Sequence, residues 1–276
     1  MSAHDGRVAS LRTRSILIVA GVGAIVTLGL LLLTVNAACP SQERDPACTR
    51  VLFIGNSYTT VNDLPGVFAS LARSGGHRVE TKSAAVDGWT LVNHADSPAT
   101  ATALTASPWD IVVLQEQSQI PAVEEFRQAQ MYPAARRLIS SIRNRGARPL
   151  LYLTWGRRDG WPETGMPTYA SMQSAIDDGY VAIAADQRVA IAPVGDAWAA
   201  MVTRTPRMEL WQEDGSHPSE AGTHLAACVF YATIFRESPK GLGYHGSLSA
   251  EAAAMIQSVA AETVLADPAK WPAPSE

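Results

Sequence analysis

Short apolar runs of strand length alternate with longer helical stretches along most of the chain. The runs predict strands at residues 50–55, 77–84, 110–115, 148–154 and 188–194. Most are apolar at consecutive positions, which is typical of parallel strands that helices cover on both faces. Helices are predicted at residues 64–75, 97–107, 123–146, 168–187, 218–237 and 249–267, the third of them kinked or split at Pro133. This alternation predicts a doubly wound, three-layer α/β/α sandwich around a mostly parallel five-stranded sheet.

A different pattern opens the chain. Residues 1–15 contain three arginines, and residues 16–35 contain no charge at all. About 20 apolar residues in a helix can cross the ~30 Å hydrocarbon layer of a membrane, and preceding arginines favour a cytoplasmic N-terminus. We therefore expect five parts: a cytoplasmic stub (1–15), a signal peptide or membrane anchor (16–38), a linker (39–49), the α/β domain (50–267) and a tail (268–276).

This N-terminal pattern predicts export of the domain. The domain is then either secreted after cleavage or anchored to the membrane on the side away from the cytoplasm, and lipidation of Cys39 is a third option. Export permits disulfides, and Cys39 and Cys48 bracket a short loop that a disulfide would close. Cys228 lies in an apolar helical stretch and is predicted to be buried.

Composition excludes several classes of function. The 276 residues are 47% hydrophobic, which is enough for the core of one α/β domain. The net charge is −4 and no block of like charges follows the N-terminus, so no nucleic-acid partner is predicted. Because no Cys/His cluster occurs at ligand spacing, no structural metal site is predicted.

Candidate chemistry lies at the two ends of the domain. Ligands of parallel sheets bind at the carboxyl ends of strands, and the first predicted strand ends in Gly-Asn-Ser-Tyr. Ser57 there either caps the next helix or is a nucleophile beside free backbone N–H groups. In "EDGSHPSEAG" (213–222), Asp214 precedes His217 by three residues. This spacing lets a carboxylate orient an imidazole base, although the segment could also be a simple surface turn.

Taken together, GNSYT at residues 55–59 and DGSHPS at residues 214–219 resemble the SGNH/GDSL hydrolases. The resemblance covers roughly residues 50–265. It implies a flavodoxin-like fold and a catalytic triad of Ser57, His217 and Asp214. It also implies a serine esterase that works through an acyl-enzyme without a cofactor.

The resemblance extends to the groups that would stabilise an oxyanion. It implies that the backbone N–H groups of Ser57 and Gly88 are donors, Gly88 lying in AAVDGWTL (84–91). The family usually has Gly-x-Asn-Asp in a third block, whereas this chain has QEQSQ at residues 115–119. A glutamine amide carries the same NH₂ donor as asparagine, so we expect a glutamine to take this role, preferably Gln115 at the end of the strand and otherwise Gln117. Alternatively, this loop only holds the substrate or supports the Ser57 turn.

The expected substrate is a small acyl ester, such as an acetyl ester on a carbohydrate. Asn56, Trp89 and Trp155 are expected to contact it, since an exposed Trp in TWGRRDGW (154–161) could stack on a sugar. Alternatively, Trp155 packs in the core, and the arginines beside it are solvated. Two other functions stay open: an acyltransferase on cell-envelope sugars, and a non-catalytic carbohydrate-binding module on the same scaffold.

Overall fold

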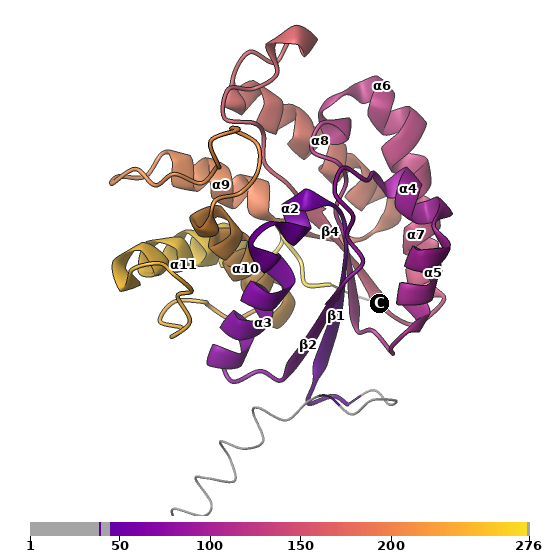
Figure 1. Ribbon diagram of the computed structural model, residues 1–276, viewed down its shortest axis with the longest axis horizontal. Coiled ribbons are helices and arrows are strands. Elements are labelled where there is room, and N and C mark those ends of the chain that lie inside the picture. Colours follow the sequence, from indigo (N-terminus) through magenta and orange to yellow (C-terminus); the bar gives the residue numbers. More distant parts are fainter. Residues whose placement is uncertain (1–38, 40–44, 275–276) are drawn as a thin grey trace, which may run out of the picture. The chain divides into compact units, whose positions relative to one another are not determined.

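Five parallel strands form the centre of the domain, in the order β2-β1-β3-β4-β5 (Figure 1). The computed structural model describes residue 39 and residues 45–274. The strands are β1 (Thr49–Ile54), β2 (Val79–Ser83), β3 (Ile111–Leu114), β4 (Arg148–Leu153) and β5 (Ala190–Pro193). Each neighbouring pair is parallel, with Val51 opposite Ile111 between β1 and β3. The predicted sheet is therefore confirmed, with strand ends that differ by a few residues.

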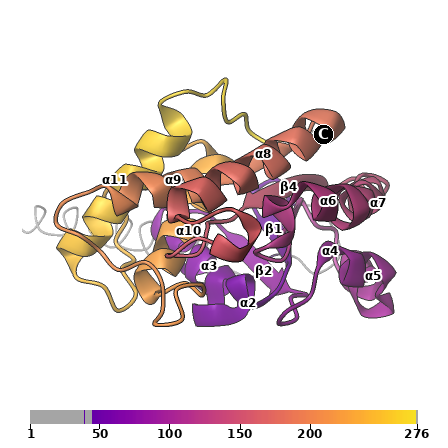
Figure 2. The same ribbon diagram turned by 90° about the horizontal axis from the view of Figure 1, so that it is seen from above.

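Helices cover both faces of this sheet, because successive strand residues are apolar. In β1, Val51 and Phe53 face one core cluster, whereas Leu52 and Ile54 face the other. The first cluster is completed by α3 (Leu64–Ser74), α9 (Val194–Val202), α10 (Glu220–Phe235) and α11 (Ala250–Leu265). The second is completed by α4 (Leu91–Asp96), α5 (Pro98–Thr105), α7 (Tyr132–Arg143) and α8 (Tyr169–Gln187). Figures 1 and 2 show the two helical layers on either side of the strands, as predicted.

Several elements differ from the sequence prediction. The expected helix at 123–146 consists of α6 (Glu124–Phe126), a π-helical turn η3 (Arg127–Met131) and α7, with Pro133 in the first turn of α7. Proline has no N–H to donate to the preceding turn, so a regular α-helix cannot continue unbroken through this position. The helices α2 (Ser57–Thr60), α4 and α9 were not predicted. Three short 3₁₀ turns, η1 (Val61–Asp63), η2 (Ile120–Ala122) and η4 (Pro162–Thr164), complete the structure.

The predicted signal peptide or membrane anchor lies outside the described residues. Within residues 45–274, none of the helices combines the length and the apolar character needed to cross a membrane. Cys39 and Cys48 form a disulfide, with their Cα atoms 5.8 Å apart. Cys228 is fully buried, as predicted. The described part of the predicted tail packs on the domain: Trp271 is buried, and its carbonyl accepts a hydrogen bond from Arg236.

Candidate active site

Ser57 is the first residue of the short helix α2, directly after the turn that leaves β1. Asn56 caps this helix, since its Oδ1 accepts a hydrogen bond from the N–H of Tyr58 at 3.2 Å. The Asn56 Nδ2 donates to the carbonyl of Trp89 at 2.9 Å. The first N–H groups of a helix have no partner within it, so the Ser57 N–H is available to a bound group. The turn thus presents a hydroxyl beside a backbone donor.

Gln115 fixes the shape of this turn from the neighbouring strand. Its Oε1 accepts hydrogen bonds from the Asn56 N–H at 2.9 Å and the Thr59 hydroxyl at 3.0 Å. Its Nε2 donates to Asn56 Oδ1 and to the Glu116 carbonyl. Glycine is needed at position 55, because a Cβ there would lie 2.4 Å from Gln115 Oε1. The close approach of this glutamine therefore explains the Gly-Asn-Ser sequence.

His217 comes from the loop between α9 and α10, far from Ser57 in sequence. Its Nε2 lies 2.9 Å from Ser57 Oγ, and its Nδ1 lies 2.5 Å from Asp214 Oδ2. Asp214 Oδ1 accepts the backbone N–H groups of Ser216 at 2.9 Å and His217 at 3.0 Å. The structure thus brings together the three residues that the sequence motifs singled out.

The charge of Asp214 suits an orienting role. Burial alone would raise the pKa of the Asp214 carboxyl. The hydrogen bonds from the His217 ring and from the N–H groups of Ser216 and His217 outweigh that effect, so the pKa is lowered. An ionised carboxylate can only accept hydrogen bonds. Nδ1 of His217 therefore carries the hydrogen, and Nε2 is left to accept a hydrogen bond from the Ser57 hydroxyl.

A stack of aromatic rings supports the His217 loop. The Tyr58 ring stacks on Trp155 with centroids 4.5 Å apart, and Trp155 stacks on Trp198 at 3.9 Å. The Trp155 Nε1 donates to the Ser216 carbonyl at 3.0 Å, and the Tyr58 hydroxyl lies 2.8 Å from Ser216 Oγ. These bonds hold the loop on a rigid apolar base.

A hollow of about 390 Å³ opens above Ser57 and His217. Gly88 lines it with a positive φ of 73°, a conformation that favours glycine. Gln117 also lines it, and its Nε2 makes only long contacts, 3.4 Å to Ser118 Oγ and 3.5 Å to Gln119 Oε1. The hollow therefore presents two groups besides the Ser57 N–H that can donate a hydrogen bond to a bound oxygen.

Four of the predicted site residues do not lie as expected. Gln115 is fully buried and uses both amide hydrogens within the protein, so the preference for it as an oxyanion donor was wrong. Trp155 is fully buried in the aromatic stack and cannot contact a substrate. The ring of Trp89 lies against His94 and does not line the hollow. Asn56 lines the hollow, but it is 3% exposed and its side chain is engaged in the turn.

Two buried polar residues that the sequence analysis gave no role hold the site together. His94 Nε2 donates to the Gly55 carbonyl at 2.8 Å, and its Nδ1 lies 3.0 Å from the Thr100 hydroxyl. Burial lowers the pKa of His94, which matches a neutral ring that donates from one nitrogen only. The other residue is Glu116. No local sequence signal identifies such contacts, which join residues that are far apart in the chain.

Glu116 connects the two loops that border the hollow. Its Oε1 accepts the Gln117 N–H at 2.7 Å and the Leu91 N–H at 3.0 Å, just after the loop that contains Gly88. The side chain is fully buried, and its Oε2 has no hydrogen-bond partner among the described residues. Burial raises the pKa of Glu116 to about 7, although these two bonds oppose the shift.

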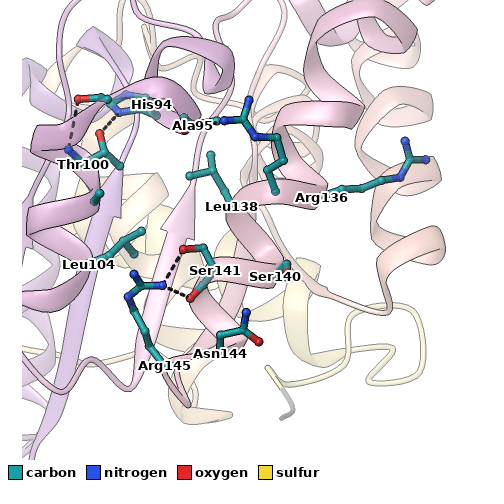
Figure 3. A pocket seen from close by; sticks show the side chains of 13 residues that line it. His94, Ala95, Thr100, Leu104, Arg136, Leu138, Ser140, Ser141, Asn144 and Arg145 are labelled. Carbon is teal, nitrogen blue, oxygen red and sulfur yellow. Dashed lines mark hydrogen bonds between the residues drawn. The ribbon is translucent and has the colours of Figure 1, made fainter.

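A hollow of about 620 Å³, larger than the one above Ser57, lies away from it, between α7 and the α4–α5 segment (Figure 3). Its arginines are already engaged. Arg136 pairs with Asp186, Arg137 pairs with Asp96, and Arg145 donates to Ser141. The cluster of Ser57, His217 and Asp214, in contrast, combines a hydroxyl, a base and an orienting carboxylate in one row. Among residues 45–274 no group of three His, Cys, Asp or Glu side chains could hold a metal ion.

Comparison with solved structures identifies similar proteins. A proposed SGNH hydrolase from Slackia heliotrinireducens is 31% identical, over 67% of this chain and 98% of that chain, with a TM-score of 0.58. A DUF4886 family protein from Bacteroides uniformis is 18% identical over 79% and 95% of the two chains, with a TM-score of 0.69. An acetyl-xylooligosaccharide esterase variant from Geobacillus is 16% identical over 73% and 97%, with a TM-score of 0.50. The last two show the fold alone. No family model and no curated protein matches the chain.

Proposed function

Because the chain belongs to the SGNH hydrolase family, and is thus a hydrolase acting on ester bonds, we propose that Ser57, His217 and Asp214 form its catalytic triad. The observation that carries this proposal is the unbroken row of hydrogen bonds from Asp214 through His217 to Ser57. A serine hydroxyl is a weak nucleophile until a neighbouring base accepts its proton. In this row, the base and the group that orients it are both in place.

The first half of the reaction forms an acyl-enzyme. Ser57 Oγ attacks the ester carbonyl carbon while its proton passes to His217 Nε2, and Asp214 stabilises the resulting imidazolium. The tetrahedral intermediate then collapses, the bond to the alcohol breaks, and the leaving alcohol takes the proton from His217. In the second half, a water molecule gives a proton to His217 Nε2 while its oxygen attacks the acyl carbon. The bond from that carbon to Ser57 Oγ then breaks, the proton passes from His217 to Ser57 Oγ, and the acid leaves.

Negative charge on the carbonyl oxygen has to be stabilised in both halves. We assign this to the N–H of Ser57, the N–H of Gly88 and the Nε2 of Gln117, all of which border the hollow. Such donors act most strongly on the transition state, where the charge develops, and each contributes on the order of 10²–10³ in rate. The glutamine thus replaces the asparagine that the family usually has in this block.

The substrate we propose is a small acyl ester of a polar, sugar-like alcohol, with acetyl as the simplest acyl group. The lining of the hollow supports this, since Gln117, Ser118 and Arg157 offer polar groups to an alcohol rather than an apolar channel to a long chain. The esterase from Geobacillus acts on acetylated xylooligosaccharides, according to its name.

Hydrolysis of 4-nitrophenyl acetate by the full chain tests this function. Ser57→Ala should lower kcat/KM by at least about 10³-fold, since loss of the nucleophile removes the acyl-enzyme route. Ser140→Ala, which changes an exposed serine on α7, is the matched control and should leave the rate unchanged. Equal rates for the wild type and Ser57→Ala would refute the assignment.

We further propose that the domain works outside the cytoplasm, secreted or anchored through residues 16–38. Two features support this: the uncharged segment after three arginines, and the disulfide between Cys39 and Cys48, a bond typical of oxidising compartments. In cells that make the full chain, a membrane-impermeant lysine reagent should label the domain without lysis. Labelling that requires lysis would contradict this location.

A further inference from the structure

Arg157 is a charged residue of the hollow that the proposed chemistry does not use. It follows β4 and lines the hollow together with Ser57 and His217. The side chain is half-buried, and its Nε is shielded from solvent without a hydrogen-bond partner. Among the residues that the structure describes, none forms an ion pair or a side-chain hydrogen bond with this guanidinium. A guanidinium that is partly removed from water without a partner is unfavourable unless a ligand supplies one.

The adjacent arginine differs at its terminal nitrogens, although the Nε of Arg158 is likewise shielded without a hydrogen-bond partner. Arg158 donates to the Gln212 carbonyl at 2.7 Å and lies 3.3 Å from Glu209 Oε1. The two arginines are neighbours in sequence but point to different surroundings. Only Arg157 is directed to the hollow, and only Arg157 is left without a counter-charge from the protein.

Asp87 lines the hollow and Asp214 lies beside it, but among the described residues neither forms an ion pair with Arg157. Asp87 is exposed and accepts a hydrogen bond from the Thr60 hydroxyl at 2.8 Å, and Asp214 is bonded to His217. Burial raises the pKa of Tyr58, whose ring lines the hollow, and the charge of Arg157 is one of the influences that oppose this shift. The positive charge of Arg157 therefore reaches the place where a substrate would lie.

We propose that Arg157 binds an anionic group on the alcohol part of the substrate, so that the ester is one of an acidic, sugar-like alcohol. This rests on the proposed esterase function of Ser57. A planar guanidinium matches a carboxylate, as in a uronic acid, and equally a sulfate or phosphate group, because two parallel N–H groups can meet two oxygens. The acyl group is small, so the anion belongs to the alcohol.

Three matched acetate esters test this inference on the full chain. They are 4-acetoxybenzoate, which carries a carboxylate, 4-acetoxyphenyl sulfate, which carries a sulfate, and methyl 4-acetoxybenzoate, which is neutral. The quantity compared is the ratio of kcat/KM for each anionic ester to that for the neutral ester. Both values in the ratio come from the same variant, so a general loss of catalytic activity lowers both and leaves the ratio unchanged.

Arg157→Gln should lower this ratio by about 10- to 100-fold, the loss expected for one charge-assisted hydrogen-bonded pair. Arg157→Lys should retain part of the wild-type preference for the anionic esters. Arg207→Gln removes an equal charge from an exposed residue outside this hollow and should leave the ratio unchanged. The anionic ester with the larger loss identifies the anion that the site prefers. Ratios that are equal in the wild type and Arg157→Gln, for both anions, would overturn the proposal.

Two further measurements separate this proposal from the proposed function. If Arg157→Gln does not fold, the salt dependence of the wild type tests the proposal instead. Added salt shortens the Debye length, to about 3 Å at 1 M, so the preference of the wild type for an anionic ester should fall. A preference that is independent of salt would refute the role. If no ester is hydrolysed, the esterase function fails, and binding of 4-hydroxybenzoate by calorimetry tests Arg157 alone. Equal affinity in the wild type and Arg157→Gln would then overturn it.

Discussion

Three consecutive residues after β3 hold three different parts of the site. Gln115 points back into the protein and fixes the Asn56 turn, while Glu116 joins the segment that contains Gly88 to the Gln117 backbone. Gln117 lines the hollow itself. In the block that departs from the family's usual asparagine, two of these three side chains therefore support the neighbouring loops, and only Gln117 lines the hollow.

Gln117 is the side chain whose removal should affect the transition state. Gln117→Glu keeps an oxygen that can accept the N–H groups of Gln119 and Ile120, but it replaces the NH₂ donor by an acceptor. We expect kcat for 4-nitrophenyl acetate to fall by about 10²-fold or more, with little change in KM. Gln117→Ala should fall by a similar factor. Full activity of Gln117→Glu at an unchanged Tm would exclude this glutamine from the oxyanion site.

At the scale of elements, η1 connects the helix that contains Ser57 to the loop that contains His217. Asn62 in η1 has a positive φ of 56°, and its Nδ2 donates to the Pro218 carbonyl and to the Thr223 hydroxyl, both at 3.0 Å. Pro218 follows His217 directly. Such left-handed residues are unfavourable except where the surrounding structure requires them. Asn62 therefore fixes the distance between the segments that contain Ser57 and His217.

Two variants of Asn62 separate its backbone from its side chain. Asn62→Gly tolerates the positive φ but loses both hydrogen bonds, and Asn62→Ala loses the bonds and strains the backbone. We expect both to lower kcat, by about 10- to 100-fold, because small displacements of catalytic groups are costly. Only Asn62→Ala should lose an additional ~1 kcal/mol of stability. Thermal unfolding and ester hydrolysis measure the two effects, and normal kcat in Asn62→Gly would refute the link.

The strands could be predicted from sequence, but α9 could not. Four of the five strands are apolar runs flanked by polar residues, which the sequence shows directly. The fifth, β2, is mostly polar and gave a weaker signal, but it was also predicted. No polar loop separates β5 from α9. Pro193 is the last residue of the strand and directly precedes the helix, whose first turn has no side-chain cap. The apolar pattern runs through both elements, so their boundary depends on tertiary packing rather than on local sequence.

Contacts in the site could be predicted only between residues that lie close together in sequence. Asp214 and His217 lie on one turn, so their spacing predicts their contact. Trp155 looked like a substrate platform because it follows a strand, but it is buried between Tyr58 and Trp198, which are both more than 40 residues away in sequence. Similarly, no periodicity in a loop shows which of two neighbouring glutamines or arginines faces the hollow.

For the domain as a whole, the buried carboxyl of Glu116 makes stability depend on pH. Its pKa is raised to about 7 by burial, from an ordinary value of about 4.5. Below about pH 4.5 both the folded and the unfolded chain hold the proton. As the pH rises from there to about 7, the unfolded chain loses it first. This group's contribution to stability is therefore complete at low pH and is lost as the pH rises through about 7.

Glu116→Gln should remove this dependence. The amide cannot ionise, and its oxygen can still accept the N–H groups of Leu91 and Gln117. Urea unfolding, followed by circular dichroism between about pH 4.5 and 8, measures the free energy of both proteins. The wild type should lose up to about 3 kcal/mol relative to the variant over this range. A difference that does not change with pH would contradict the raised pKa.

Covalent trapping of the nucleophile tests the central claim most directly. The full chain is treated with a fluorophosphonate, which phosphonylates activated serines, and the adduct is located by mass spectrometry of peptides. We predict a single adduct on Ser57, none in Ser57→Ala, and much slower labelling in His217→Gln, in which the base is lost. An active enzyme that is labelled on another residue, or that is labelled equally fast in Ser57→Ala, would contradict the account.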